Sequence, residues 1–318
     1  MTRQSDPDTR RPPADSRGTT LRVVCGPTAA GKSRIAEALA AANGLAIVSA
    51  DSRQVYRGFD IGTAKPPRGV AVRYFGVDVA EPTERYSAAR WADAAAGWVA
   101  EARAEGLEPI VVGGTGFYLR ALFDPLFEEP ELDPERRAPL QRLLDELPSD
   151  ELRRWCLALD PARAGLGRTQ LLRAVEVALL TGRRLSELHS ERQRPARFSA
   201  RYLVVDPGPS LAGRIEQRVW QMLDAGWEDE VRGLNRSVPE DAPAWNATGY
   251  RHVRALVRGE LAREEAVRRT VIDTRQYAKR QRTWFRHQLP EARVTRLDPC
   301  DPGADRIAGA WWRGEMTA

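Results

Sequence analysis

The sequence contains little cysteine, little histidine and no long apolar run. Only three cysteines occur in 318 residues, Cys25, Cys156 and Cys300, and they are widely spaced without a C-x-x-C pair. This pattern is typical of a reducing compartment and argues against both a disulfide scaffold and a structural zinc site. The three histidines form no metal-binding or catalytic pattern.

The sequence shows neither an apolar segment long enough to span a membrane nor the pattern of a secretory signal. The longest apolar runs are far shorter than the ~20 residues that span a bilayer. Residues 1–18 are rich in Arg, Pro and Asp and lack the apolar stretch of a secretory signal. We therefore expect a cytoplasmic protein without a membrane partner, with a disordered tail at residues 1–18.

The remaining composition is that of a globular protein. Hydrophobic residues make up 42% of the chain and charged residues 29%, which is enough apolar material for a full core. The net charge of +5 is only a mild indication of a polyanionic partner.

One short segment organises the rest of the sequence. The pattern G-x-x-x-x-G-K-S occupies residues 26–33, between an apolar run at 21–25 and a helical pattern at 34–40. Strand, loop and helix in this order are the expected context of a P-loop. Glycines let backbone N–H groups surround phosphate oxygens, Lys32 supplies a positive charge, and the Ser33 hydroxyl can ligate Mg²⁺. The predicted phosphate-binding residues are Gly26, Pro27, Thr28, Ala29, Ala30, Gly31, Lys32 and Ser33.

Strands and helices alternate after the P-loop. Apolar runs at 45–49 and 109–112 each end in a polar or glycine-rich segment. This alternation predicts an α/β fold, a P-loop NTPase-like parallel sheet with helices on both faces. Ligands of such sheets bind beyond the carboxyl ends of strands, which places Asp51 and Thr115 near the P-loop. The glycine-rich segment at 113–116 is either a second wall of the ligand crevice or a tight strand-to-helix turn.

The composition changes after Phe123. Residues 124–165 are rich in acids and prolines and contain a helical pattern at 135–147, which predicts a small helical insertion. The catalytic core is then expected at 19–123 and 166–290. Residues 291–318 form a C-terminal extension to which we assign no function.

A basic run lies near the end of the predicted core. Residues 263–296 contain ten Lys and Arg residues. The run is either a solvated helix face or a surface for nucleic acid or phosphate. Trp284 and Phe285 within it could stack on RNA, but their helical spacing favours core positions.

Seven segments occur together in order: 26–33, 51–58 (DSRQVYRG), 62–66 (GTAKP), 113–118 (GGTGFY), 173–177 (RAVEV), 249–251 (GYR) and 274–286 (TRQYAKRQRTWFR). In these segments the chain resembles the bacterial tRNA dimethylallyltransferases, also called tRNA isopentenyltransferases. The resemblance covers about residues 20–290. The segments 51–58 and 274–286 are far more specific than the P-loop.

The resemblance implies a particular reaction. A dimethylallyl group would pass from dimethylallyl diphosphate to N6 of the adenosine 3′-adjacent to the anticodon, in tRNAs that read codons beginning with U. The P-loop would then hold a diphosphate, with Mg²⁺ as cofactor. The helical insertion would grip the anticodon stem-loop of the tRNA, and the protein would be a monomer.

The chemistry suggests roles for single residues. The adenine amino group is a weak nucleophile because its lone pair is delocalised, so a carboxylate that takes its proton would help, and Asp51 is the candidate general base. Asp51 could instead be a Mg²⁺ ligand or a helix N-cap. Negative charge grows on the leaving diphosphate, where amides, Lys32, Mg²⁺ and an arginine can stabilise it. The resemblance implies that this arginine is Arg218, with Arg214 as the alternative, and that Thr115 contacts the target nucleotide.

The resemblance also implies a set of tRNA-binding residues. They are Asp51, Ser52, Arg53, Gln54, Thr115, Arg137, Thr169, Gln170 and Arg173.

The chain departs from the family pattern at three places. Ala30 replaces a usual serine, and Tyr74 and Phe75 replace paired histidines. A Gln-Arg pair is usual where Thr169 and Gln170 stand. We expect Arg173 to keep its tRNA contact and Gln170 to make a weaker, neutral one.

Two other functions remain open. A small-molecule or nucleoside kinase would use the same P-loop to transfer a phosphoryl group from ATP. A non-catalytic RNA-binding protein with a vestigial P-loop would bind tRNA regardless of Lys32 and Asp51.

Overall fold

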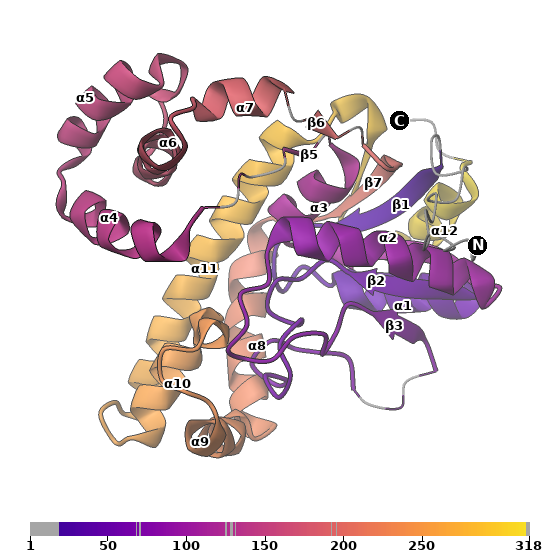
Figure 1. Cartoon of the computed structure of the whole chain (residues 1–318). Helices are drawn as coiled ribbons and strands as arrows, with labels where there is room; N and C mark the ends of the chain where they lie inside the picture. Colours follow the sequence, from indigo (N-terminus) through magenta and orange to yellow (C-terminus); the bar gives the residue numbers. More distant parts are fainter. Residues whose placement is uncertain are drawn as a thin grey trace, which may run out of the picture. The chain divides into compact units, whose positions relative to one another are not determined.

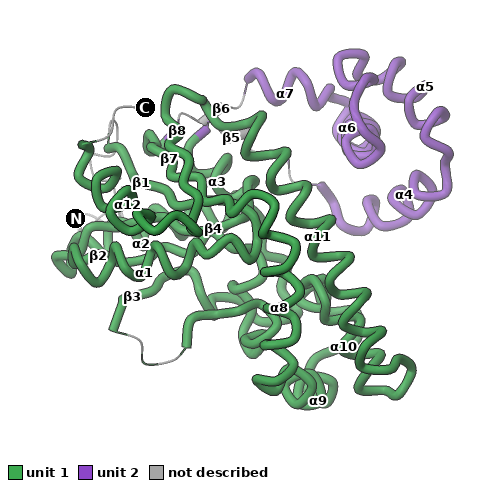
Figure 2. The backbone as a smooth tube through the Cα atoms, turned by 180° about the vertical axis from the view of Figure 1, so that it is seen from behind, with its two compact units in different colours: residues 1–123, 197–318 green, residues 124–196 purple. Residues whose placement is uncertain are grey.

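The computed structural model describes residues 19–315 except 68, 70, 125, 128, 129, 131, 192 and 195, so the predicted disordered tail lies outside the described residues. The chain divides into two compact units (Figure 2). Unit 1 contains the chain up to Phe123 and from Arg197 onward, and unit 2 is Asp124–Ala196. None of the described helices is long and apolar enough to span a bilayer.

Unit 1 is built on one parallel sheet, as predicted (Figure 1). Its strand order is β3-β2-β4-β1-β7-β8. Every neighbouring pair in it is parallel. The strands are β1 (Thr20–Cys25), β2 (Leu45–Ser49), β3 (Arg73–Phe75), β4 (Glu108–Gly113), β7 (Ser199–Val205) and β8 (Val294–Leu297). The carboxyl ends of β1, β4 and β2 are therefore adjacent along one edge, where the P-loop, Gly113 and Asp51 follow.

Helices cover both faces of the sheet. On one face α1 (Lys32–Asn43) and α12 (Ala304–Arg313) share an apolar cluster with the strands, including Ile35, Leu39 and Trp311. On the other face α2 (Ala88–Ala104) and α3 (Gly116–Phe123) pack through a stacked pair, Trp91 and Tyr118, with ring centroids 4.7 Å apart. The Trp91 indole also donates to the Ser49 carbonyl at the end of β2, which ties α2 to the sheet.

Four further helices lie beyond the carboxyl edge of the sheet. They are α8 (Leu211–Asp224), α9 (Trp227–Ser237), α10 (Tyr250–Val257) and the long α11 (Arg263–Gln288). Arg275 contacts Ala212 and Glu216, whereas Arg263 pairs with Asp224. Because the later residue of α11 meets the earlier part of α8, the two helices run antiparallel.

Unit 2 is larger than the predicted insertion. It contains β5 (Leu126–Phe127), α4 (Pro134–Glu146), α5 (Ser149–Leu159), α6 (Arg168–Thr181), α7 (Leu185–Glu191) and β6 (Gln193–Arg194). We expected residues 166–196 in the core. The structure instead buries Leu171, Val175 and Leu188 of this stretch against Leu144 and Leu152. The apolar face of α6 has the same sequence pattern whether it packs in the core of unit 1 or of unit 2. The pattern alone therefore did not show to which unit α6 belongs.

The predicted C-terminal extension also differs from the structure. β8 is an edge strand paired with β7, and α12 belongs to the cluster that covers the sheet. A strand of four residues is too short for a period-two pattern to stand out. The described residues after Pro290 therefore complete unit 1.

Candidate active site

The P-loop joins β1 to α1 in the predicted manner. Gly26 has φ of +146°, and a Cβ there would lie 2.1 Å from the Val205 carbonyl oxygen, so only glycine fits beside β7. Gly31, with φ of 92°, precedes the first turn of α1. The first amides of α1 thus point toward the loop, where an anion is favoured by their free N–H groups and by the helix dipole.

Side chains from other helices hold the P-loop backbone. Gln281 of α11 accepts a hydrogen bond from the Thr28 amide at 2.8 Å and donates to the Gly114 carbonyl at 2.8 Å. Arg214 of α8 donates to the Ala29 carbonyl at 3.1 Å. Ala29 itself has a left-handed φ of 60°, which these contacts help to maintain.

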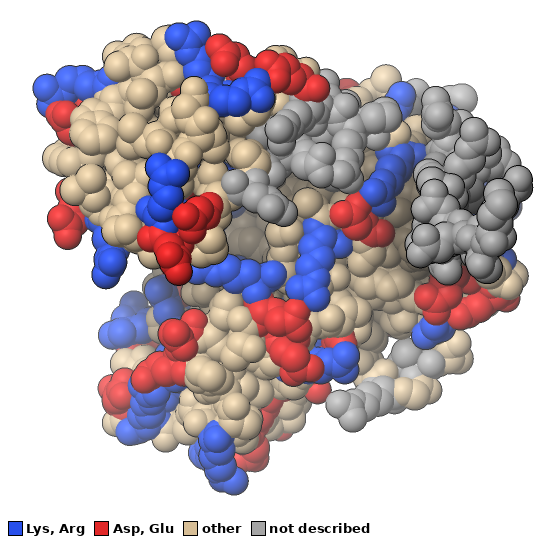
Figure 3. Space-filling model, in the orientation of Figure 1, with Lys and Arg blue, Asp and Glu red and all other residues tan. Residues whose placement is uncertain are grey.

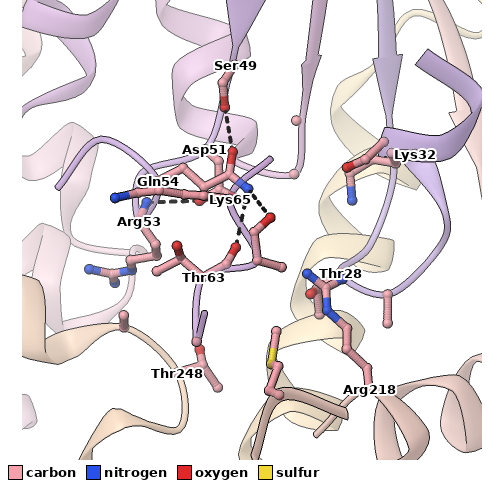
Figure 4. A pocket seen from close by; sticks show the side chains of 18 of the residues that line it. Thr28, Lys32, Ser49, Asp51, Arg53, Gln54, Thr63, Lys65, Arg218 and Thr248 are labelled. Carbon is pink, nitrogen blue, oxygen red and sulfur yellow. Dashed lines mark hydrogen bonds between the residues drawn. The ribbon is translucent and has the colours of Figure 1, made fainter. Parts of the chain in front are cut away.

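A cavity of about 350 Å³ opens beside the P-loop, entirely within unit 1. One wall carries Thr28, Lys32 and Arg218, and the facing wall carries Asp51, Arg53, Gln54 and Lys65 (Figure 4). The volume is suited to a small phosphorylated ligand and part of a second substrate.

Two cations stand together at this site. Burial and the neighbouring Arg218 guanidinium lower the pKa of Lys32 to about 8. Burial also lowers the pKa of Arg218, against the attraction of Asp51. Lys32 donates to the Pro27 carbonyl at 2.7 Å. A bound diphosphate would satisfy two closely spaced positive charges.

The candidate base lies on the opposite wall, after β2. One oxygen of Asp51 accepts a hydrogen bond from the Arg53 amide at 2.8 Å. Residues 52–55 form turns and no helix begins there, so Asp51 is not a helix N-cap. Its carboxylate acts electrostatically on Lys32, Arg218 and Tyr277, which places all three near it.

The segment that follows Asp51 is held rigidly. Lys65, with only 4% of its side chain exposed, pairs with Asp60 and Asp78. Gln54 accepts from Ser49 at 3.0 Å and donates to the carbonyls of Thr63 and Ala64. The predicted tRNA-binding residue Gln54 therefore lines the cavity and also fixes the loop that forms its wall.

Thr115 is hydrogen bonded to the segment that follows Asp51 and is not one of the residues that line the cavity. Its hydroxyl accepts from the Ser52 amide at 3.0 Å and hydrogen bonds with the Tyr277 hydroxyl. Burial, together with the charge of Asp51, raises the pKa of Tyr277 to about 12. The structure thus brings Asp51, Ser52, Arg53 and Thr115 together, as expected from the sequence.

The structure separates the two candidate arginines. Arg218 lines the cavity, whereas Arg214, one turn earlier, contacts the outside of the P-loop and lies 3.8 Å from the Cys300 sulfur.

The candidate residues of unit 2 form a cluster of their own. Glu176, 3% exposed, binds Arg137 at 2.7 Å and Arg173 at 2.5 Å. Burial acts to raise the pKa of Glu176, but the hydrogen bonds from both arginines lower it below its usual value. Thr169 is exposed in the first turn of α6, and Gln170 accepts from the Gly167 amide there. The structure does not assign an RNA contact to any of them.

Most basic residues of the run at 263–296 form ion pairs with acidic residues of unit 1. Arg275 pairs with Glu216 and Arg282 with Asp206, while Arg268 and Arg269 share Glu265. On the face shown in Figure 3, basic side chains are interspersed with acidic ones. Phe285 is 3% exposed, which confirms its predicted core position. Lys279, Arg280 and Arg286 remain exposed on α11.

Sequence reasoning missed several residues of the cavity. Thr270, Thr274, Tyr277 and Gln281 all line it from α11. Their spacing of three or four residues is a helical stripe, a signal that stands in the sequence but that the basic residues around it obscure. Tyr74, at a departure from the family pattern, also lines the cavity and donates to Glu37 at 2.6 Å.

The fold and the site are those of a P-loop protein with a cavity beside the loop. The profile of the IPP transferase family matches residues 54–288, and that of an isopentenyl transferase family matches residues 19–69. The chain belongs to the IPP transferase family, and is therefore a prenyltransferase.

Similar proteins carry matching names. The chain is 40% identical to the tRNA dimethylallyltransferase of Thermosynechococcus vestitus over 274 residues, which are 84% of this chain and 86% of the relative. It is 42% identical to that of Anaeromyxobacter sp. (strain K) over 276 residues, 84% of this chain and 90% of the relative.

Solved structures agree with this relationship. The crystal structure of the tRNA isopentenylpyrophosphate transferase of Bacillus halodurans has a TM-score of 0.65 at 29% identity and covers 93% of this chain and 96% of its own. The corresponding transferase of Staphylococcus epidermidis has a TM-score of 0.65 at 27% identity, with 93% and 98% covered. These names match prenyl transfer and not the kinase alternative.

Proposed function

We propose that this chain transfers a dimethylallyl group from dimethylallyl diphosphate to N6 of the adenosine 3′-adjacent to the anticodon, in tRNAs that read codons beginning with U. The observation that carries the proposal is one cavity in which the P-loop, Lys32 and Arg218 face the Asp51 carboxylate. The names of the relatives support tRNA as the substrate. The anticodon stem-loop, the dimethylallyl donor and a monomeric state are the finer parts of this proposal.

The donor side of the reaction belongs to the P-loop. The amides of the loop and of the α1 N-terminus, with Lys32 and Arg218, would hold the diphosphate. As the bond between the allylic carbon and oxygen breaks, charge on the diphosphate grows, and these groups stabilise it without reorganising. Because Gln281 and Arg214 already fix the loop backbone, the cradle is preorganised.

The acceptor side belongs to the wall that carries Asp51. Asp51 would take a proton from the N6 amino group as it attacks the allylic carbon. Its hydrogen bond with the Arg53 amide orients one oxygen and leaves the carboxylate at the cavity. The adenosine must leave its stack to reach this position. Ser52, Arg53, Gln54 and Thr115 surround Asp51 and are the proposed contacts to the nucleotide in unit 1.

Mg²⁺ is the proposed cofactor. Among the described residues no three His, Cys, Asp or Glu side chains gather as a metal site. Ser33 lines the cavity, and a Mg²⁺ ion that bridges phosphates commonly has one or two protein ligands and several waters. The residues present therefore fit an ion held by Ser33 and the diphosphate, and bound Mg²⁺ would neutralise charge on the leaving group.

In unit 2, Arg137, Thr169, Gln170 and Arg173 are the proposed contacts to the anticodon stem-loop. Glu176 orients the two arginines, so their guanidinium groups are presented in a fixed geometry. Gln170 already caps α6, which is consistent with a weaker contact to RNA.

A transfer assay tests the function. The protein would be incubated with Mg²⁺, dimethylallyl diphosphate and an unmodified anticodon stem-loop, and the nucleosides would be weighed after digestion. Asp51→Asn retains the acceptor for the Arg53 amide and removes the base, so kcat should fall by about 10²–10⁴. The exposed Asp229→Asn serves as the matched control. An Asp51→Asn enzyme with wild-type kcat would exclude Asp51 as the general base. ATP consumption with a simple acceptor would instead support the kinase alternative.

The two arginines of α8 form a second pair of variants. Arg218→Gln should lower kcat by about 10²–10³, because the charge that faces the leaving group is lost. Arg214→Gln should act mainly on KM for the donor, since Arg214 only holds the loop. The opposite pattern would assign the leaving-group role to Arg214.

A further inference from the structure

The cavity extends along one side of α1, where the proposed reaction uses none of the side chains beyond Ser33. Glu37 of α1, Ile47 of β2 and Tyr74 of β3 all line it there. Glu37 comes four residues after Ser33, about one helical turn, so both side chains lie on the same face of α1. Ile47 and Tyr74 are paired in the register of β2 and β3, so they lie on the same face of the sheet. Glu37 and Ser33 thus line the same side of the cavity.

Glu37 is an acidic residue without a cationic partner. The Tyr74 hydroxyl donates to one of its carboxylate oxygens at 2.6 Å. Within the part of the chain that the structure describes, Tyr74 is the only hydrogen-bonding partner of this side chain, and no Lys, Arg or His forms an ion pair with it. Burial and the Glu37 carboxylate raise the pKa of Tyr74 above its ordinary value, so the phenol remains a donor throughout the working pH range. One Glu37 oxygen is therefore fixed, and the other has no partner among the described residues.

An unpaired carboxylate is unexpected at a site for an anion. The P-loop with Lys32 and Arg218 is the proposed binding site of the diphosphate (Figure 4), and a negative charge on the same cavity repels that ligand. The repulsion is offset when a divalent cation lies between the two negative groups, as where Mg²⁺ joins a carboxylate to a substrate phosphate. The position of Glu37 beside Ser33 therefore fits an anion that binds together with its cation.

We propose that Glu37, oriented by Tyr74, accepts a hydrogen bond from a water ligand of the Mg²⁺ ion that accompanies the diphosphate. The result is selectivity, because the cavity binds the magnesium complex of the diphosphate in preference to the metal-free anion. Glu37 is a positioning residue, since it acts on the diphosphate only through the ion and its water. The proposal rests on the proposed function, because it takes Ser33 and the diphosphate to hold the ion.

The hydrogen bond from Tyr74 favours a contact through water over direct coordination. A carboxylate that binds a cation with both oxygens must have both of them free, and Tyr74 occupies one oxygen of Glu37. Mg²⁺ loses its waters reluctantly and usually keeps several of them in protein sites. Carboxylates around metal sites commonly hold the groups that ligate the metal in a fixed orientation. One free oxygen on an oriented side chain therefore suits a water ligand better than the ion itself.

Asp51 is the only other carboxylate among the described residues that line the cavity, and its position is different. It follows β2 on the wall that faces Lys32 and Arg218 (Figure 4), and its charge acts on both of them. Asp51 would therefore take the proton of the attacking amino group, whereas Glu37, on the side of α1, acts on the leaving diphosphate. The two carboxylates of the cavity thus have separate roles.

Binding of inorganic diphosphate in the absence of RNA tests the inference independently of catalysis. Calorimetry on the full chain gives the Kd of diphosphate in excess Mg²⁺ and its Kd in EDTA. The ratio of the two values measures the coupling between metal and anion. For the wild type we expect the magnesium complex to bind at least tenfold more tightly than the metal-free anion.

Isosteric variants identify the groups involved. Glu37→Gln keeps an acceptor for Tyr74 and removes the charge. It should weaken binding of the magnesium complex about tenfold, the effect of one hydrogen bond to a charged group, and should not weaken binding of the metal-free anion. Tyr74→Phe leaves the carboxylate but removes the group that orients it, so the ratio should fall by a smaller factor of about three. Glu108→Gln is the matched control, since its exposed carboxylate lies at the amino end of β4, and it should leave the ratio unchanged.

The outcomes separate the inference from the proposed function. A Glu37→Gln variant that keeps the wild-type ratio, whether or not both Kd values change, would overturn the inference, because Glu37 would then have only a structural role. A wild-type ratio near one would overturn it as well. A wild-type protein that binds diphosphate in neither condition would instead remove the donor side of the proposed function. Thermal melting checks that both variants of the pair are folded.

Discussion

The surroundings of Lys32 in the folded protein disfavour its positive charge. Burial and Arg218 lower its pKa to about 8, from an ordinary value of 10.5. The folded state therefore carries a destabilised charge below about pH 8. This unfavourable contribution is largest at neutral pH and disappears as pH rises from 8 toward 10.5. An anion that binds beside Lys32 would offset this unfavourable contribution to stability. Part of the binding free energy of such an anion would come from this effect.

Replacing Lys32 with methionine should stabilise the empty protein. At pH 7 we expect Lys32→Met to raise the free energy of unfolding by on the order of 2 kcal/mol, and the gain should shrink by pH 10. Urea unfolding at the two pH values measures this. The exposed Lys279→Met is the control and should have no comparable effect. A gain that is absent at pH 7, or that does not change with pH, would contradict the account.

Glu176 presents the opposite case in unit 2. Despite burial, its two arginine partners lower its pKa, so its stabilising contribution is present above its ordinary pKa and is lost as pH falls through the lowered one. Glu176→Gln leaves Arg137 and Arg173 without a countercharge and should destabilise unit 2 by about 2 kcal/mol. Hydrogen exchange of α4 and α6 amides reports this locally. Glu187→Gln, which breaks an exposed pair with Arg184, should change stability by less than about 0.5 kcal/mol. Equal protection losses in the two variants would refute the role of Glu176.

At the level of elements, α11 connects the parts of the site. From one helix, Gln281 bonds to the P-loop and to Gly114, Tyr277 meets Thr115, and Thr270 lines the cavity. These contacts of α11 hold the P-loop and the wall that carries Asp51 in position on opposite sides of the cavity. A change at a single turn of α11 is expected to act on the whole cavity.

Gln281→Leu isolates the contact between α11 and the P-loop. The Thr28 amide and the Gly114 carbonyl each lose a partner, and two hydrogen bonds of about 1 kcal/mol predict a rise in KM for dimethylallyl diphosphate of at least tenfold. The effect on KM for RNA should be small. Steady-state kinetics with each substrate varied in turn measures this. Gln276→Leu, exposed on the same helix, is the control. A donor KM that stays at the wild-type value would show that the loop keeps its shape without α11.

The sequence identified those elements whose chemistry and topology agree. The P-loop, Asp51 and Thr115 were placed together because parallel strands end at one edge of a sheet, and the structure brings them together there. Arg214 and Arg218 could not be separated, since residues four apart share a helix face, and only the packing of α8 decides which one enters the cavity. Gln281 was missed because its role arises from a partner 167 residues away.

At the scale of the whole molecule, two units have separate cores. The cluster of unit 1 joins the sheet to α1 and α12, and that of unit 2 joins α4 to α7. The boundary at residue 124 was visible as a change of composition, whereas the return at residue 196 was not, because α6 is amphipathic in either context. β5 and β6 pair antiparallel, with Leu126 opposite Arg194, so the two connections of unit 2 lie side by side.

This pairing makes unit 2 removable. A variant with residues 124–196 replaced by a short Gly-Ser linker should fold and bind dimethylallyl diphosphate with a Kd within about threefold of the wild type. It should lose nearly all affinity for the stem-loop. Calorimetry with the donor and gel-shift titration with RNA measure the two properties. An intact affinity for RNA would show that unit 2 does not bind the stem-loop. An unfolded variant would show that unit 1 needs unit 2 in order to fold.

The position of Cys300 has a practical consequence. Cys25 and Cys156 are buried, so Cys300 is the one exposed thiol of the chain. Its sulfur lies 3.8 Å from Arg214, which in turn grips the Ala29 carbonyl of the phosphate loop at 3.1 Å. A maleimide fluorophore would therefore attach at a single site on the unaltered sequence, two contacts from the P-loop that is proposed to hold the diphosphate. Its emission can follow donor arrival and product departure in stopped-flow experiments, without a radioactive substrate and without an engineered reporter.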